Sequence, residues 1–239
     1  MKKIIHRAED RGAAEHGWLH TKFSFSFSEY YDPEKMGFGL LRVLNDDIVE
    51  PGKGFGMHPH NNMEIITIIL EGELQHKDSM GNGSVIKKNE VQVMSAGSGI
   101  LHSEFNPSGT EKVNLLQIWI YPKEKNIKPR YDQKKFDPSE RENKIQTVVS
   151  GISKNGALYI HQDASLSLLN LEKDKSLKYE IHKKGNAVYL FLIDGQVQLD
   201  DEELFRRDAA GLSGTDEISI LAKEKSDILI IEVPMDNER

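Results

Sequence analysis

Short strand-like segments separated by turn residues are the feature that most limits how this chain can fold. Apolar residues gather in short runs, as in residues 64–70 and 113–121, and glycine or asparagine stands between many of them. The clearest turn is Gly81-Asn82-Gly83, a typical hairpin sequence. Many short strands joined by tight turns are typical of a β-sandwich or β-barrel, so the sequence predicts an all-β fold.

The strand-like pattern occurs twice, on either side of a polar segment. Residues 123–144 contain many lysines, two prolines and few apolar residues. Acidic residues dilute that charge, so we interpret this segment as a solvated linker rather than as a basic docking patch. The chain of 239 residues is long enough for two cores. We therefore expect one domain over residues 1–122, a linker over 123–144 and a second domain over 145–239.

An aromatic stripe precedes the first long apolar run. Phe23, Phe25 and Phe27 alternate with serines. Side chains two residues apart on a strand share a face. The pattern predicts a strand over residues 21–30 whose phenylalanines pack in the core.

The composition removes several classes of function. The chain has no cysteine, which excludes disulfides, thiolate metal sites and a cysteine nucleophile. The formal net charge of −7 argues against a nucleic-acid-binding surface. No hydrophobic stretch follows the two N-terminal lysines, and no run approaches the ~20 apolar residues of a membrane helix. We expect a cytoplasmic protein that binds neither nucleic acid nor membrane.

Two pairs of potential metal ligands stand out. His58 and His60 flank a proline, and His102 and Glu104 follow a glycine-containing turn. Each pair has the i, i+2 spacing that aims two side chains to the same side of a strand. Three imidazoles and one carboxylate suit a divalent transition metal such as iron, manganese, nickel, copper or zinc. The sequence predicts one metal site if the two strands meet.

Glu64 competes with Glu104 for the carboxylate position, because on a straight strand it shares the parity of His58 and His60. A straight strand would place its Cα about 13 Å from that of His60, whereas the Cα atoms of His102 and Glu104 would be only about 6.6 Å apart. We therefore favour Glu104 as the ligand and Glu64 as a carboxylate behind the site. His76 lies near the predicted hairpin, where we interpret it as structural.

The chain resembles the pirins, and among them the bacterial pirin-like proteins assigned quercetin 2,3-dioxygenase activity. The resemblance is carried by His16-Gly-Trp-Leu19, Gly54-Phe-Gly-Met-His-Pro-His60, His76-Lys-Asp-Ser79, Gln92-Val-Met-Ser-Ala-Gly97 and His102-Ser-Glu104-x-Asn106. It covers the first half densely, and Tyr159-Ile-His-Gln-Asp163 resembles the start of the family's second domain.

The resemblance implies a bicupin, with two cupin barrels in one chain and metal only in the first. It implies His58, His60, His102 and Glu104 as metal ligands, with iron as the first expectation and manganese, nickel, cobalt, copper or zinc as alternatives. It further implies cleavage of a flavonol such as quercetin by O₂ with release of carbon monoxide. In our chemical account of that reaction, Glu104 could detach or lean away from the metal and act as general base for the flavonol 3-hydroxyl.

A non-enzymatic role is the second hypothesis. Some pirins act as metal-dependent partners of transcription regulators or metabolic enzymes. In that case the site would be a regulatory or redox sensor.

We expect the protein to be a monomer. Two barrels in one chain already bury one sheet face of each barrel against the other.

Overall fold

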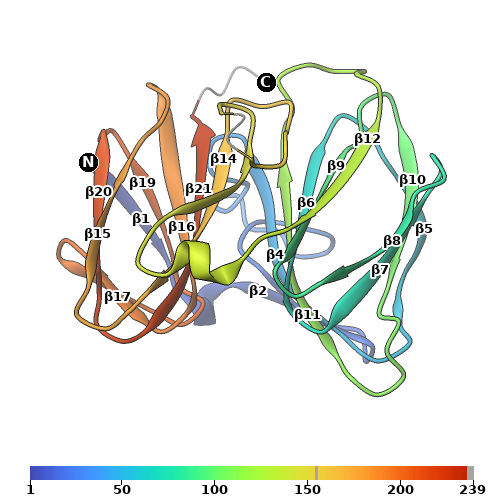
Figure 1. The fold of residues 1–239 in the computed structure, drawn as a ribbon, viewed down its shortest axis with the longest axis horizontal. Helices are drawn as coiled ribbons and strands as arrows, with labels where there is room; N and C mark the ends of the chain where they lie inside the picture. The colour runs from blue at the N-terminus through green and yellow to red at the C-terminus, as the bar shows by residue number, and fades with distance from the viewer. Residues whose placement is uncertain (154–155, 236–239) are drawn as a thin grey trace.

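The computed structural model describes residues 1–153 and 156–235, and it is built almost entirely of β-strands. Two β-barrels lie side by side, the N-terminal one at the right of Figure 1 and the C-terminal one at the left. Two 3₁₀ turns, Ala8–Asp10 and Pro138–Arg141, interrupt the strands. Within these ranges no helix is long and apolar enough to span a membrane. The prediction of an all-β fold with two cupin-type barrels is confirmed.

The N-terminal barrel is built from two sheets. Its larger sheet has the order β12-β9-β6-β11-β4-β3-β2. These strands are β12 (Arg130–Lys135), β9 (Glu90–Ser95), β6 (Glu64–Glu71), β11 (Val113–Ile120), β4 (Leu41–Val49), β3 (Leu19–Phe23) and β2 (Gly12–Glu15). Its smaller sheet consists, in spatial order, of β5 (Gly54–His60), β10 (Ile100–Phe105), β7 (Glu73–Asp78) and β8 (Gly83–Lys87).

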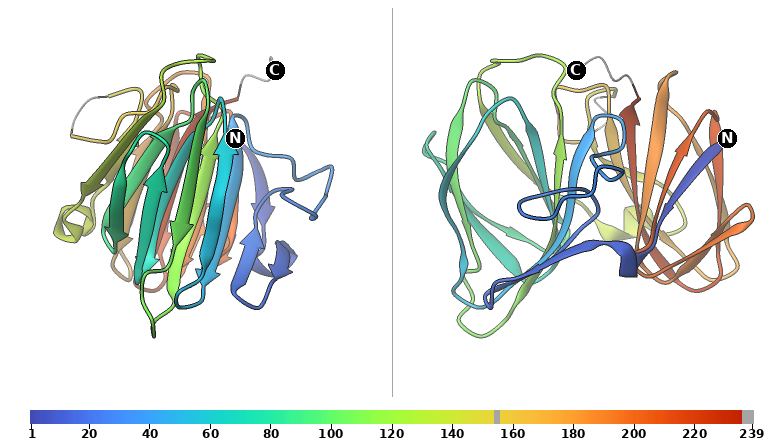
Figure 2. Two further views of the ribbon diagram at one scale, coloured as in Figure 1. Left: turned by 90° about the vertical axis from the view of Figure 1, so that its right-hand side faces the viewer. Right: turned by 180° about the vertical axis from the view of Figure 1, so that it is seen from behind.

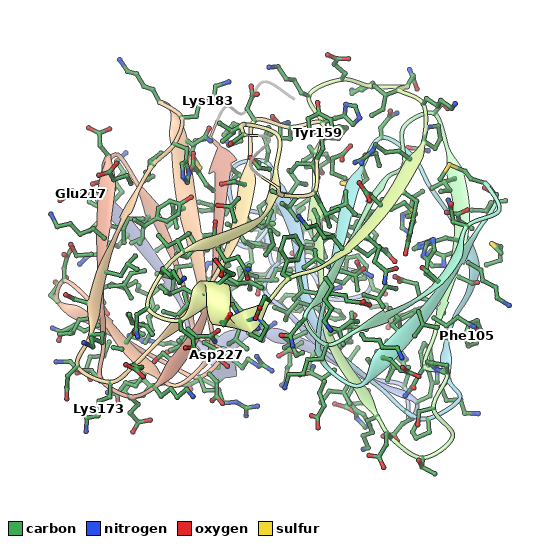
Figure 3. All side chains as sticks on the ribbon, in the orientation of Figure 1. Phe105, Tyr159, Lys173, Lys183, Glu217 and Asp227 are labelled. Atoms are coloured by element: carbon green, nitrogen blue, oxygen red, sulfur yellow. The ribbon has the colours of Figure 1, made fainter. Side chains whose placement is uncertain are left out.

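The C-terminal barrel repeats this plan. Its larger sheet consists, in spatial order, of β1 (Lys2–His6), β19 (Ala209–Ser213), β16 (Asn186–Asp194), β21 (Ser226–Pro234), β14 (Ser165–Leu171) and β13 (Gln146–Ser150). Its smaller sheet consists of β15 (Ser176–Glu180), β20 (Glu217–Ala222), β17 (Gln196–Leu199) and β18 (Glu202–Phe205). In Figure 3, Lys173, Lys183 and Glu217 lie on this barrel and Phe105 lies on the other.

The largest apolar core lies between the two barrels. Ile66 and Ile68 of β6 belong to one apolar cluster with Tyr189 and Phe191 of β16. The intervening residues of each strand face the inside of its own barrel, because side chains alternate along a strand. The two large sheets are therefore buried on both faces, which explains why their central strands read as continuous apolar runs.

The interiors of the two barrels differ in chemistry. Val188, Leu190 and Ile230 belong to an apolar cluster inside the C-terminal barrel. The corresponding positions of the N-terminal barrel include the buried polar residues Thr67 and Gln117. Apolar side chains offer no metal ligands, and a metal-free second barrel stays a prediction.

Two segments differ in position from the sequence-based expectation. Strand β1 pairs with β19 of the C-terminal barrel, and the dark blue N-terminal segment then crosses to the other barrel (Figure 2). Strand β12 pairs with β9, so interpreting residues 130–135 as solvated linker was wrong. An edge strand is held by backbone hydrogen bonds and needs no apolar alternation, which is why its polar sequence concealed it. The boundaries 1–122, 123–144 and 145–239 otherwise stay predictions.

The predicted strand over residues 21–30 was wrong beyond Phe23, where β3 ends. The hydroxyl of Ser26 bonds both the amide and the carbonyl of Asp32, and this local pairing replaces a sheet ladder. Phe25 is still buried, against Tyr189 of the other barrel. Phe27 instead contacts Trp119, with ring centroids 5.3 Å apart.

Candidate metal centre

A β-bulge in strand β5 sets the direction of its side chains. In the antiparallel pair of β5 and β10, His58 lies opposite His102 and Phe55 lies opposite Glu104. Two residues of β5 thus stand opposite one residue of β10, which lets Phe55, His58 and His60 line the same cavity. Met57 in the bulge is exposed.

Three imidazoles converge on one point, as the sequence predicts. The ring centroid of His58 lies 4.4 Å from that of His102 and 4.9 Å from that of His60. The centroids of His60 and His102 are also 4.9 Å apart. Each ring offers a nitrogen within 4.8 Å of the other two. This spacing allows the three side chains to share a single ion.

Glu104 lies beside this group and is buried in the same cavity. Its Oε2 accepts a hydrogen bond of 3.0 Å from the side-chain amide of Gln117, and its Oε1 is buried with no hydrogen-bond partner in residues 1–153 and 156–235. The ligand atoms that lie within 4.8 Å of one another form two groups. One contains His58, His60 and His102, and the other joins Glu104 to His76 and His102. Coordination by Glu104 of the same ion as the three histidines stays a prediction.

Glu64 faces away from the histidines. It is the first residue of β6 and its carboxylate accepts a 2.8 Å hydrogen bond from Ser95. Burial raises the pKa of Glu64 to about 7, partly offset by Ser95 and the backbone of His161. The left-handed backbone of Asn62, with φ of 47°, turns the chain between β5 and β6. That turn breaks the straight-strand parity that linked Glu64 to His58 and His60.

Two of the three histidine rings, those of His60 and His102, are poised as neutral ligands. Burial, with smaller contributions from His58, His60 and His76, lowers the pKa of His102 to about 2. Burial and His58 lower the pKa of His60 to about 4. Burial raises the pKa of Glu104 to about 7. Neutral imidazoles keep the lone pairs that metal ions bind.

A metal ion fits these residues by two observations. The Nε2 atom of His102 and the Oε1 atom of Glu104 are buried and have no partner among the described residues. An unpartnered buried polar atom costs roughly 1–3 kcal/mol, which a coordinate bond would offset. The donor set of imidazole nitrogens and a carboxylate also suits first-row divalent transition metals.

Aromatic side chains and buried acids complete the cavity, which has a volume of about 200 Å³. Trp119 meets the ring of His60 edge-on, with centroids 4.8 Å apart. The cavity wall comprises Phe27, Asn45, Asp47, Phe55, His58, His60, Ile65, His102, Glu104, Gln117 and Trp119. Sequence reasoning missed Asn45, Asp47 and Gln117, although polar residues inside apolar strands were a usable signal.

Comparison with known proteins places the chain in a family. The Pirin family model matches residues 5–120, and the model of the quercetinase C-terminal cupin domain matches residues 147–233. A relative from Escherichia coli strain K12, named quercetin 2,3-dioxygenase, is 43% identical over 230 residues, which cover 96% of this chain and 98% of the relative.

Two solved structures from Escherichia coli are similar to this chain over nearly its whole length. The crystal structure of YhhW from Escherichia coli covers 100% of both chains with a TM-score of 0.94 and 42% identity. The bacterial pirin YhhW in complex with nickel(II), from the same organism, matches with a TM-score of 0.92 and 42% identity over 98% of this chain and 99% of that one. This chain, with its two cupin barrels and its histidine cluster in the first, belongs to the pirin family.

Proposed function

We propose that this protein is a metal-dependent dioxygenase that cleaves the heterocycle of a flavonol such as quercetin with O₂ and releases carbon monoxide. The observation that carries the proposal is the convergence of three imidazoles beside a buried carboxylate in an aromatic-lined cavity. The names of relatives more than 40% identical add weight to this choice of substrate.

His58, His60 and His102 would hold the metal, with Glu104 as the fourth ligand. Iron is the metal we expect first, and the nickel complex of the Escherichia coli pirin keeps nickel among the alternatives. When bound, the metal supplies Lewis-acid polarisation of a substrate oxygen and redox chemistry toward O₂.

Glu104 would detach from the ion and accept the proton of the flavonol 3-hydroxyl at Oε1, the oxygen that has no hydrogen-bond partner among the described residues. Gln117 holds the other oxygen, Oε2, through a 3.0 Å hydrogen bond. That hydrogen bond orients the carboxylate and leaves Oε1 available to accept the proton, as a general base requires.

The aromatic wall would orient the flat substrate and exclude water. Phe27, Phe55 and Trp119 line the cavity next to the histidines. Aromatic faces stack on flat ring systems, and a cavity lined mainly by apolar side chains with a few polar groups is typical of small-molecule sites.

The test is turnover of quercetin by protein loaded separately with Fe(II), Mn(II), Ni(II), Co(II) or Cu(II). We expect equal amounts of O₂ consumed and carbon monoxide released, with His58→Ala removing at least about 99% of the rate because the ion loses a ligand. A matched control is His161→Ala in the C-terminal barrel, whose rate should equal that of the wild type. A wild-type protein that binds these metals yet consumes no O₂ would contradict the proposal and favour the regulatory role.

A further inference from the structure

His76 lies directly behind His102. Strands β7 and β10 are antiparallel neighbours in which His76 is opposite Glu104 and Asp78 is opposite His102. His76 is fully buried, and its ring centroid is 5.3 Å from that of His102. The sequence showed only a histidine near a hairpin, because the pairing of β7 with β10 cannot be read from the residues.

A chain of polar contacts runs from Asp78 through His76 to His102. The Nε2 of His76 lies 3.3 Å from Oδ2 of Asp78, and the Nδ1 of His76 lies 3.5 Å from the Nδ1 of His102. Asp78 also accepts hydrogen bonds from the amides of Met80 and Asn82 and from the Asn82 side chain. These donors fix Asp78 as an acceptor.

Asp78, the acceptor at one end, determines which nitrogen of His76 and of His102 carries the proton. A neutral imidazole has one N–H and one lone pair. If Nε2 of His76 donates to Asp78, its Nδ1 carries the lone pair and can only accept. His102 must then donate from its own Nδ1, which leaves its lone pair on Nε2. That Nε2 is buried and has no hydrogen-bond partner in the part of the chain that the structure describes.

Two other contacts favour the same arrangement. Tyr131 of β12 stacks on His76 with a centroid distance of 4.7 Å and an interplanar angle of 27°, which holds the ring in place. The Nδ1 of His58 lies 2.7 Å from the carbonyl oxygen of Gly56 in the bulge, so it donates there and likewise keeps its lone pair on Nε2. Two of the three histidines thus have an acceptor for Nδ1–H.

We propose that His76 is a positioning residue for the metal centre: together with Asp78 it fixes His102 in the tautomer that presents Nε2 to the ion. The inference rests on the metal centre of the proposed function. Partners that orient ligating histidines are usually carboxylates or carbonyls, and their loss typically weakens metal binding about 10- to 100-fold. Here a second imidazole stands between the ligand and the carboxylate.

The first test is the protonation of each ring nitrogen in the metal-free wild-type protein, read by long-range ¹H–¹⁵N NMR of the imidazoles. We expect the proton on Nε2 of His76 and on Nδ1 of His102. A proton on Nδ1 of His76 would overturn the assignment, and so would a metal-bound nitrogen of His76 in the zinc-loaded protein.

The second test is zinc affinity, measured by competition with a chelator. His76→Phe keeps a flat ring against Tyr131 but has no acceptor, so we expect zinc to bind about 10- to 100-fold more weakly. His76→Asn places Oδ1 where Nδ1 stood and should recover most of the affinity. His161→Phe, which also removes an imidazole packed on a tyrosine, should bind as the wild type does.

Unchanged affinity in His76→Phe, or equal losses in both His76 variants, would overturn the role of His76. Thermal unfolding of each metal-free variant separates a lost orientation from a lost fold. A wild-type protein that takes up no zinc would refute the metal centre itself, while the tautomers of the metal-free protein would still decide the function of His76.

Discussion

The two oxygens of Glu104 have different environments, and this difference is the basis of its proposed role. Oε2 is held by Gln117 on β11, whereas Oε1 has no hydrogen-bond partner among the described residues, and the side chain lines the same cavity as the three histidines. A carboxylate held at one oxygen is oriented for chemistry at the other.

Replacing Glu104 by glutamine tests that role, because an amide cannot accept the substrate proton. We expect Glu104→Gln to lower the rate of quercetin turnover by about 100-fold or more, measured with an oxygen electrode. Glu64→Gln makes the same change at a buried carboxylate that faces the other barrel and should leave the rate unchanged. A Glu104→Gln protein with the full wild-type rate would rule out the general base.

The raised pKa of Glu64 predicts that the stability of the protein depends on pH. Its pKa rises from 4.5 in the unfolded chain to about 7 in the folded protein, mainly through burial. The folded state therefore keeps a proton that the unfolded state loses between about pH 4.5 and 7, so the free energy of unfolding falls as the pH rises through that window.

Glu64→Gln should remove this contribution. Urea denaturation of metal-free protein is expected to show the variant gaining on the order of 2–3 kcal/mol relative to wild type between pH 4.5 and pH 8. An identical pH profile for the two proteins would show that folding does not raise the pKa of Glu64.

At the scale of elements, the close approach of β5 to β10 builds the site. Gly54 lies opposite Phe105, and a Cβ at Gly54 would overlap the backbone of Glu104 and Phe105. A Cβ at Gly56 would meet nothing within 4 Å. The two glycines of one strand thus have different functions: the first allows backbone contact and the second lies open in the bulge.

Gly54→Ala should push β5 away from β10 and separate His58 from His102. We expect a loss of about 1–3 kcal/mol in the free energy of unfolding, by urea denaturation, together with weaker zinc binding. Gly56→Ala keeps the carbonyl that accepts from His58 and should change both quantities little. Equal effects of the two substitutions would contradict this account of the strand pair.

Whether an element could be predicted from the sequence depends on which interactions determine it. Strand β6 was predictable because it is a continuous apolar run, and the meeting of His58, His60 and His102 followed from two i, i+2 pairs. Strand β12 is an edge strand held by its backbone, and His76 reaches the site only through the register of β7 on β10. Neither register nor edge pairing leaves a pattern in one strand's own residues.

At the scale of the molecule, charged residues hold the two barrels together beside their shared apolar core. Arg207 of the C-terminal half lies 2.9 Å from a carboxylate oxygen of Asp46 on β4, and Arg11 lies 3.6 Å from the same oxygen. The Arg207 guanidinium also donates to the Asn114 side chain. Asp46 adjoins Asp47, which lines the metal cavity, so this contact links the second barrel to the wall of the site.

Removing Arg207 should weaken the whole protein. We expect Arg207→Met to lower the free energy of unfolding by roughly 1–2 kcal/mol in urea denaturation, because it leaves the partly buried Asp46 without its nearer arginine. Arg206→Met removes a neighbouring arginine whose ion pair with Asp194 is exposed and should change stability by less than about 0.5 kcal/mol. A loss of the same size in both variants would show that the contact between the barrels stabilises the protein no more than an exposed ion pair does.

The twofold architecture was accessible from the sequence, but the place of the main core was not. The continuous apolar runs of β6 and β16 indicate that both faces of each strand are buried, but they do not show which sheet packs on which. The packing of the two large sheets on each other appears only in the folded protein. As a result, Phe25 and strand β1 contact the second barrel.

The most direct test of the metal centre is anomalous diffraction at the nickel edge from crystals of the nickel-loaded protein. One peak is expected inside the N-terminal barrel, about 2.0–2.2 Å from the Nε2 atoms of His58, His60 and His102 and from a carboxylate oxygen of Glu104. A peak bound elsewhere, or a crystal of folded protein that takes up no nickel, would contradict the account.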